Sequence, residues 1–122
     1  MNTKITAVLG ASTKPERYSN KAVHMLKAHG HEVIPVHPLH REVEGLTAVP
    51  HLDQLPKEID TITVYLSPET SEKLSEAFIA AAPRRVIFNP GAESSALEEK
   101  LLAAGIKVEN ACTLVLLQTG QY

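Results

Sequence analysis

Short apolar segments that are typical of strands alternate with helix-like segments, and this order constrains the fold more than any other feature. Five runs rich in aliphatic and β-branched residues predict strands at 5–9, 32–36, 60–66, 85–88 and 106–109. Apolar residues at helical spacing lie between most of them, at 19–29, 70–82 and 95–104. Repeated strand–helix–strand order favours a parallel sheet with right-handed crossovers and helices on both faces.

The remaining segments are less defined. Ser19 or Asn20 can cap the first helix, and Gly30 ends it. Residues 37–56 are loop-like, with one short strand or helical turn in their second half. Residues 113–117 fit either a strand or a final helix. We therefore expect an α/β fold of three layers, with a mostly parallel sheet of five strands, or of six if the last segment is a strand.

Composition is ordinary for one globular domain, which we expect to span residues 1–122. Of the 122 residues, 43% are hydrophobic and 21% charged, and the net charge of −2 disfavours nucleic-acid binding by bulk charge. The single cysteine, Cys112, excludes an intrachain disulfide and favours a reducing, cytoplasmic setting. No signal segment and no apolar run of membrane-spanning length is apparent, so we expect no membrane partner.

In an open parallel sheet, ligands bind beyond the carboxyl ends of the strands. The first loop there, after residues 5–9, contains Gly10, hydroxyls at Ser12 and Thr13, and the cations Lys14 and Arg17 just before a helix start. Such a loop suits phosphate, because free N–H groups at a helix N-terminus attract anions. A capped turn with two solvated cations fits the same residues, so the loop alone does not decide.

The sequence disfavours two common nucleotide sites. Gly10 lacks the other glycines of G-x-G-x-x-G, and the second strand ends at Val36-His37-Pro38 without the carboxylate that holds the ribose of NAD. Glu32 stands at the opposite end of that strand. The motif G-x-x-x-x-G-K-[ST] is also missing, which excludes a P-loop NTPase.

Four segments, taken in order and spacing, resemble the small stand-alone CoA-binding proteins: GASTKPERYSNKAVHMLKAHGHEVIPVHP, VYLSPE, RVIFNPGAES and NACTLVLLQTG. These proteins are similar to the CoA-binding domain of the succinyl-CoA synthetase alpha subunit. The resemblance runs from about Ile5 to Gln121 and implies a Rossmann-like fold that binds CoA. The phosphorylated histidine of the synthetase belongs to a domain that has no counterpart here, so ligase activity is not implied.

The resemblance also implies which residues contact CoA. The diphosphate would lie against Gly10, Ala11, Ser12, Lys14, Arg17, Tyr18 and Ser19. The adenosine end would lie against Val36, His37 and Pro38, with Arg41 in place of a lysine that many relatives carry after the proline. The middle of the groove would be lined by Leu66, Ser67 and Pro68, and its far side by Asn89, Pro90 and Gly91.

We therefore expect a protein that binds CoA or an acyl-CoA at the carboxyl edge without catalysis of its own, as a carrier, sensor or regulatory partner. Two alternatives remain open: an enzyme that uses CoA or another nucleotide, and an interaction domain with an unused groove. Cys112 is either a small buried thiol or a reactive group near the pantetheine end. The histidines form no four-ligand pattern, so we expect no metal. Oligomeric state stays open.

Overall fold

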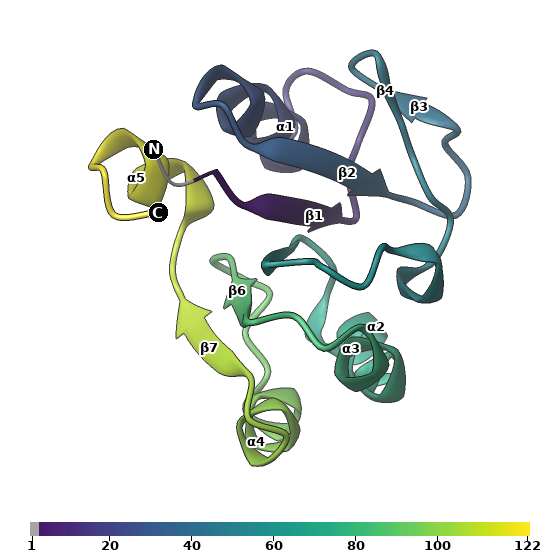
Figure 1. Ribbon diagram of the computed structural model, residues 1–122, viewed down its shortest axis with the longest axis vertical. Coiled ribbons are helices and arrows are strands. Elements are labelled where there is room, and N and C mark those ends of the chain that lie inside the picture. The colour runs from purple at the N-terminus through teal and green to yellow at the C-terminus, as the bar shows by residue number, and fades with distance from the viewer. Residues whose placement is uncertain (1–2) are drawn as a thin grey trace.

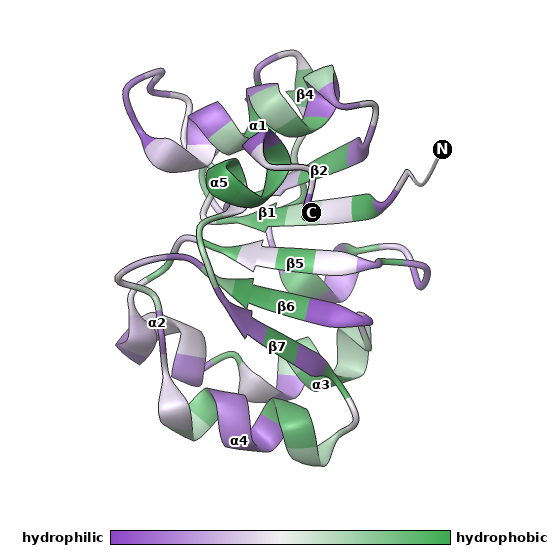
Figure 2. Cartoon of the chain, turned by 90° about the vertical axis from the view of Figure 1, so that its left-hand side faces the viewer, coloured by the Kyte–Doolittle hydropathy of each residue, from purple (hydrophilic) through white to green (hydrophobic). Residues whose placement is uncertain are grey.

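The computed structural model describes residues 3–122 and contains one parallel five-stranded sheet, which confirms the α/β class and the five-stranded alternative (Figure 1). Its strands are β1 (Ile5–Leu9), β2 (Glu32–Val36), β5 (Thr61–Val64), β6 (Arg85–Phe88) and β7 (Lys107–Asn110), arranged in the order β2-β1-β5-β6-β7. The arrowheads of β1, β5, β6 and β7 point to the same side in Figure 2. All carboxyl ends therefore meet at one edge of the sheet.

Helices cover both faces of the sheet, which completes the three layers. On one face, α1 (Tyr18–Ala28) packs against α5 (Thr113–Gln118). The other face is covered by α2 (Pro68–Glu72), α3 (Ser75–Ala81) and α4 (Ser95–Ala103). Because residues 113–118 are helical, the alternative of a sixth strand there is wrong.

The helix that we expected over residues 70–82 is two helices in the structure. Ser67 caps α2 by accepting a hydrogen bond from the Thr70 N–H, and Pro68 occupies the first turn. A tight turn follows, in which the Leu74 N–H donates to the Ser71 carbonyl at 2.9 Å, and α3 then starts at Ser75. No proline or glycine marks this break, so the sequence carries no local signal for it.

The loop-like segment 37–56 contains more structure than expected. A small hairpin of β3 (Glu42–Val43) and β4 (Leu46–Thr47) turns through Glu44 and Gly45, both with positive φ, as two-residue hairpin turns require. The chain then pairs Val49 with Val36 and continues into the 3-10 helix η1 (Leu52–Gln54). This pairing holds η1 beside the carboxyl end of β2.

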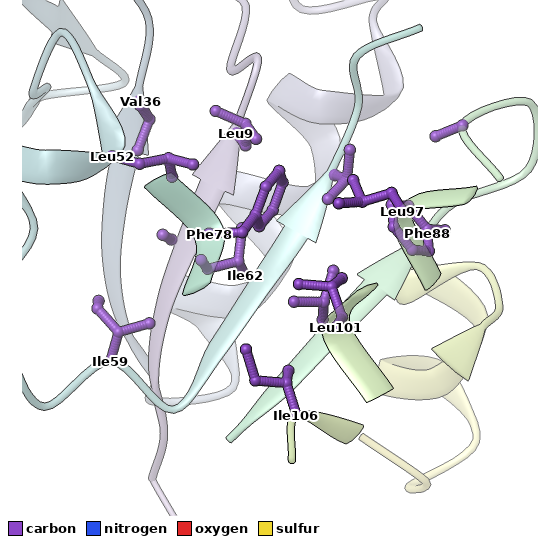
Figure 3. Packing of buried hydrophobic residues seen from close by; sticks show 14 residues of the cluster. Leu9, Val36, Leu52, Ile59, Ile62, Phe78, Phe88, Leu97, Leu101 and Ile106 are labelled. Atoms are coloured by element: carbon purple, nitrogen blue, oxygen red, sulfur yellow. The ribbon is translucent and has the colours of Figure 1, made fainter. Parts of the chain in front are cut away.

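The main hydrophobic core lies between the sheet and the α3/α4 layer (Figure 3). Strand residues that point to this face, such as Ile62 and Phe88, pack with Phe78 of α3 and Leu101 of α4, and all four are fully buried. A smaller cluster packs under α1 and α5. Successive strand residues alternate between these two faces, as the period of a β-strand requires.

Candidate functional site

The order of strands reverses between β1 and β5, so the loops that follow them form the crevice where open α/β sheets bind ligands. Gly10 ends β1 with φ +88° and allows the two loops to touch. A Cβ at this position would lie 2.9 Å from Leu66 Cδ2 and 3.3 Å from the Tyr65 carbonyl oxygen. Only glycine fits this crossing without displacing the loop after β5.

A basic pocket of about 350 Å³ lies beside this crossing, at the N-terminus of α1. Its walls contain both cations of the first loop, and no acidic residue stands in the first turn of the helix. The structure thereby brings together most of the residues proposed to hold a diphosphate; the lining residues are Gly10, Ser12, Lys14, Arg17, Tyr18, Ser19 and Tyr65. Lys14 and Arg17 are exposed, so both are accessible to a ligand.

The first loop is fixed by the helix that follows it. Ser19 and Asn20 lie inside α1, so the expectation that one of them caps the helix is wrong; the N-cap position is Arg17. The Ser19 hydroxyl instead accepts a hydrogen bond from the Ser12 N–H, and the Asn20 amide donates to the Ser12 carbonyl. Both contacts hold the loop in one conformation before any ligand arrives.

The backbone of the first residues in this loop is already engaged. The N–H groups of Gly10 and Ala11 both donate to the Val36 carbonyl, at 3.0 and 3.3 Å. The Ala11 side chain is fully buried under α1. In this conformation, therefore, Gly10 lines the pocket, whereas the expected residue Ala11 is buried and is not among its lining residues. The hydroxyls, the cations and the helix N-terminus are the groups available to an anion.

An apolar cleft of about 490 Å³ adjoins the basic pocket on the other side of Gly10. The expected residues Val36, His37, Pro38 and Leu66 line it. Sequence reasoning missed Leu9 of β1 and the walls that come from the η1 region and from the α2–α3 segment: Pro50, His51, Leu52, Asp53, Thr70, Leu74 and Ala77. The apolar residues Val49, Leu52 and Leu55, all of which contact the main core, were the local signs that this segment packs against the sheet.

Two polar side chains matter in this cleft. His37 accepts a hydrogen bond from the Leu39 N–H at Nδ1, and burial, with the neighbouring His40, lowers the pKa of His37, so its ring is neutral at pH 7. Asp53 brings a carboxylate into the cleft from η1. The end of β2 has no carboxylate, as the sequence indicates, but the cleft as a whole does contain one.

A third, smaller cavity of about 210 Å³ continues the groove along the edge, between the loops after β5 and β6. Its lining includes the expected residues Leu66, Ser67, Asn89, Pro90 and Gly91. Asn89 is buried and donates to Thr63 Oγ1 at 2.7 Å and to the Val64 carbonyl at 2.9 Å. Its side-chain oxygen accepts the Thr113 N–H at 2.9 Å, so one side chain aligns three segments of this edge.

Tyr65 lies between the basic pocket and the third cavity and lines both of them. Its hydroxyl is buried close to Thr63 and Thr113, and among residues 3–122 it has no hydrogen-bond partner of ordinary geometry. Burial raises the pKa of Tyr65, so the hydroxyl keeps its proton. Tyr65 is a candidate site residue that the sequence did not single out.

Two expected residues lie apart from the groove. Arg41 is exposed just before the β3–β4 hairpin and lines neither the basic pocket nor the apolar cleft. Pro68 serves the first turn of α2 and is not among the residues that line these cavities. Cys112, in contrast, lies at the carboxyl edge as expected, directly before α5 and only partly exposed.

The groove therefore combines a cationic pocket, an apolar cleft and an extension along the sheet edge, and this combination agrees with a comparison of the whole chain. Residues 4–118 match the CoA binding domain family. This chain belongs to that family. The resemblance noted in the sequence is thereby confirmed over nearly its full length.

Individual relatives agree with this assignment. The protein YneT of Bacillus subtilis is 33% identical over 76 residues, which are 62% of this chain and 56% of that protein, so the match spans little more than half of the relative. A crystal structure of an uncharacterized protein covers 100% of both chains at 38% identity, with a TM-score of 0.94. An acetyl-coenzyme A synthetase of Ca. Korarchaeum cryptofilum has a TM-score of 0.76 over 90% of this chain and 26% of its own, at 20% identity, which shows a shared fold.

Two further observations concern residues 3–122. No group of three or more histidine, cysteine, aspartate or glutamate side chains is placed to hold a metal ion. None of the helices in this range has the length and apolar character needed to cross a membrane.

Proposed function

We propose that this protein binds CoA or an acyl-CoA in the groove at the carboxyl edge of its sheet, in the cytoplasm. The proposed role is that of a carrier, sensor or regulatory partner, without catalysis of its own. The observation that carries the proposal is the junction at Gly10, where a pocket with two cations and a helix N-terminus meets an apolar cleft. CoA has a charged diphosphate between a flat adenine, carried on a phosphorylated ribose, and a long, uncharged pantetheine arm.

The residues fit the ligand in a definite order. Ser12, Lys14 and Arg17 would neutralise and hydrogen-bond the diphosphate, helped by the first N–H groups of α1. His37 and Pro38 would pack against the adenosine end, with Leu66 on the facing wall. The pantetheine arm would follow the edge past Asn89 and Pro90. Arg41 is too poorly placed in this conformation to be assigned a phosphate contact.

A binding role without catalysis is supported by what surrounds the reactive side chains. Among residues 3–122, no serine or cysteine of the groove is hydrogen-bonded to a histidine, the pairing that activates a nucleophile. In the neutral His37 ring, Nδ1 already accepts a hydrogen bond from the Leu39 N–H. In the proposed role, these residues position the ligand.

Charge reversal at the two loop cations tests the placement of the phosphates. We expect the Lys14→Glu/Arg17→Glu variant to bind CoA at least about tenfold more weakly by calorimetry, because it removes two charge-assisted contacts. The matched control is Arg84→Glu/Lys107→Glu, which makes the same charge change at the amino edge of the sheet. Unchanged CoA affinity in the loop variant would contradict the placement.

The choice of ligand needs a second measurement. A thermal-shift panel of CoA, acetyl-CoA, NAD, NADP, ATP and AMP should show stabilisation by the CoA species. Asp53 makes NAD the most informative competitor, because a carboxylate in the cleft can accept hydrogen bonds from a ribose. A response to NAD without a response to CoA would overturn the proposal, and no response at all would favour an interaction domain.

A further inference from the structure

A fourth cavity lies at the same edge, between α5 and the loops after β6 and β7. Its volume is about 410 Å³, and its walls include Tyr18, Tyr65, Pro90, Cys112, Leu114 and Val115. Two of these side chains are large hydrophobic groups left open to solvent, since Tyr18 is 69% and Val115 50% exposed. We call it the α5 cavity.

The α5 cavity adjoins the proposed CoA groove. It shares Tyr18 and Tyr65 with the basic pocket. It also shares Tyr65 and Pro90 with the third cavity, along which the pantetheine arm would run. A ligand that leaves the basic pocket along the sheet edge would therefore reach the α5 cavity by passing the side chain of Tyr65.

The walls of the α5 cavity favour an acyl chain that is uncharged as well as long enough to fill it. None of its lining side chains is charged, in contrast to the basic pocket with Lys14 and Arg17. A free thiol or an acetyl group would fill only a small part of its volume. A longer apolar chain would cover Leu114 and Val115 and remove their surface from water. A free carboxylate at the end of the chain, as in the thioester of a dicarboxylic acid, would lose its hydration without gaining a cationic partner.

We propose that the α5 cavity holds the acyl chain of an acyl-CoA, and that the preferred ligand is a thioester of a neutral aliphatic acid. This inference rests on the proposed function, because it takes the CoA moiety to lie in the groove. It adds the substrate class. Medium-length, uncharged acyl groups are preferred over free CoA, over acetyl-CoA and over thioesters of dicarboxylic acids.

Calorimetric titration with CoA, acetyl-CoA, octanoyl-CoA and succinyl-CoA tests the proposal. Octanoyl-CoA should bind at least about tenfold more tightly than CoA, because each methylene removed from water adds to affinity. Succinyl-CoA should bind no more tightly than acetyl-CoA. The Val115→Gln variant should bring the ratio of the CoA and octanoyl-CoA dissociation constants close to one, while Leu102→Gln, at a similarly half-exposed leucine of α4, should keep the wild-type ratio.

The outcomes separate this inference from the proposed function. If no CoA species binds, the proposed function fails and the acyl site fails with it. If CoA and all thioesters bind equally, only the acyl site is overturned. If wild-type protein is dimeric by light scattering, Val115→Gln is monomeric, and chain length has no effect on affinity, a second copy of the chain covers the cavity and the acyl site is overturned as well.

Discussion

The two faces of the sheet differ in the chemistry that they bury. Toward α3 and α4, strands β5 and β6 present only apolar side chains, among them Ile62 and Phe88. Toward α5, the same two strands present Thr61, Thr63 and Arg85, and these are also buried. The first face is held by hydrophobic contact, whereas the second adds buried side-chain hydrogen bonds to a smaller hydrophobic cluster.

The difference matters for the site because the two kinds of contact have different geometry. Hydrophobic burial stabilises without strong direction, whereas a hydrogen bond constrains distance and angle. Asn89, at the carboxyl end of the polar face, bonds to Thr63, Val64 and Thr113, and so it aligns the edge that forms the groove. We infer that the apolar face supplies stability and that the carboxyl half of the polar face orders the site.

The largest expected effect is on the apolar face. Leu101→Ala should lower the free energy of unfolding by about 2–5 kcal/mol, because Leu101 is fully buried and the truncation leaves a cavity. CoA affinity of the folded variant should be unchanged. Urea unfolding and calorimetry measure the two quantities, and Leu102→Ala, at the exposed neighbour, should stay within about 0.5 kcal/mol of wild type. Weakened CoA binding by folded Leu101→Ala would break the division between the faces.

An intermediate effect is expected at Asn89. Asn89→Ala should cost about 2–3 kcal/mol of unfolding free energy, because it orphans the buried N–H of Thr113 and removes the amide donor to Thr63 Oγ1 and the Val64 carbonyl. The Thr63 hydroxyl keeps its hydrogen bond to the Thr113 hydroxyl. Unlike Leu101→Ala, it should also weaken CoA binding by more than about tenfold, because the loops that form the groove lose their alignment. A tenfold loss of affinity corresponds to about 1.4 kcal/mol of binding free energy. Asn110→Ala, which loses one exposed hydrogen bond to Glu98, is the control. Full CoA affinity in Asn89→Ala would show that the edge is ordered by other contacts.

The smallest effect concerns the amino half of the polar face. Arg85 is buried, donates to Thr61 at 3.0 Å and to Glu109 at 2.9 Å, and stacks 4.5 Å from the Tyr122 ring centre. Glu109→Gln should cost about 1–2 kcal/mol by urea unfolding, because it leaves the guanidinium charge unpaired while Glu109 itself is only partly buried. CoA affinity should not change, since this pair lies at the amino end of β6.

A double variant sharpens this last prediction. Arg85→Met/Glu109→Met should lose less stability than Arg85→Met and Glu109→Met lose separately in sum, because the charge and its partner leave together. A strictly additive loss would mean that the two residues do not act as a pair.

β1, β5 and β6 could be predicted because each is a short run of mostly apolar or β-branched residues that is buried on both faces. β2 and β7 are partly exposed, and apolar residues such as Val33 and Val108 mark them in the sequence. The helical spacing of apolar residues predicted the bounds of α1 and α4 to within about two residues. The break at Leu74, the burial of Ser19 and Asn20 and the helical state of residues 113–118 could not be predicted, because each depends on contacts with distant segments. The hydrogen bond between Thr113 and Asn89 is one such contact.

The site shows the same limit. Residues of the first loop and of β2 were predicted because they follow strands directly, and those ends must meet at one edge. Asp53 and Leu52 reach the cleft only through the pairing of Val49 with Val36, which no local pattern indicates. Tyr65 was missed because an aromatic residue at the end of a strand is ordinary in a core, and only its position between two cavities marks it.

The strand order has a consequence for how the chain folds during synthesis. β1 and β2 pair over a short stretch of sequence, and α1 can cover them as soon as they emerge. The other edge of β1, however, pairs with β5, which is made much later. Until residues 61–64 emerge, an apolar strand destined for the middle of the sheet is an open edge, the kind of surface on which nascent chains aggregate. The slow step of folding is therefore expected to be the closure of β5 on β1, the same contact that brings Leu66 against Gly10 and completes the groove.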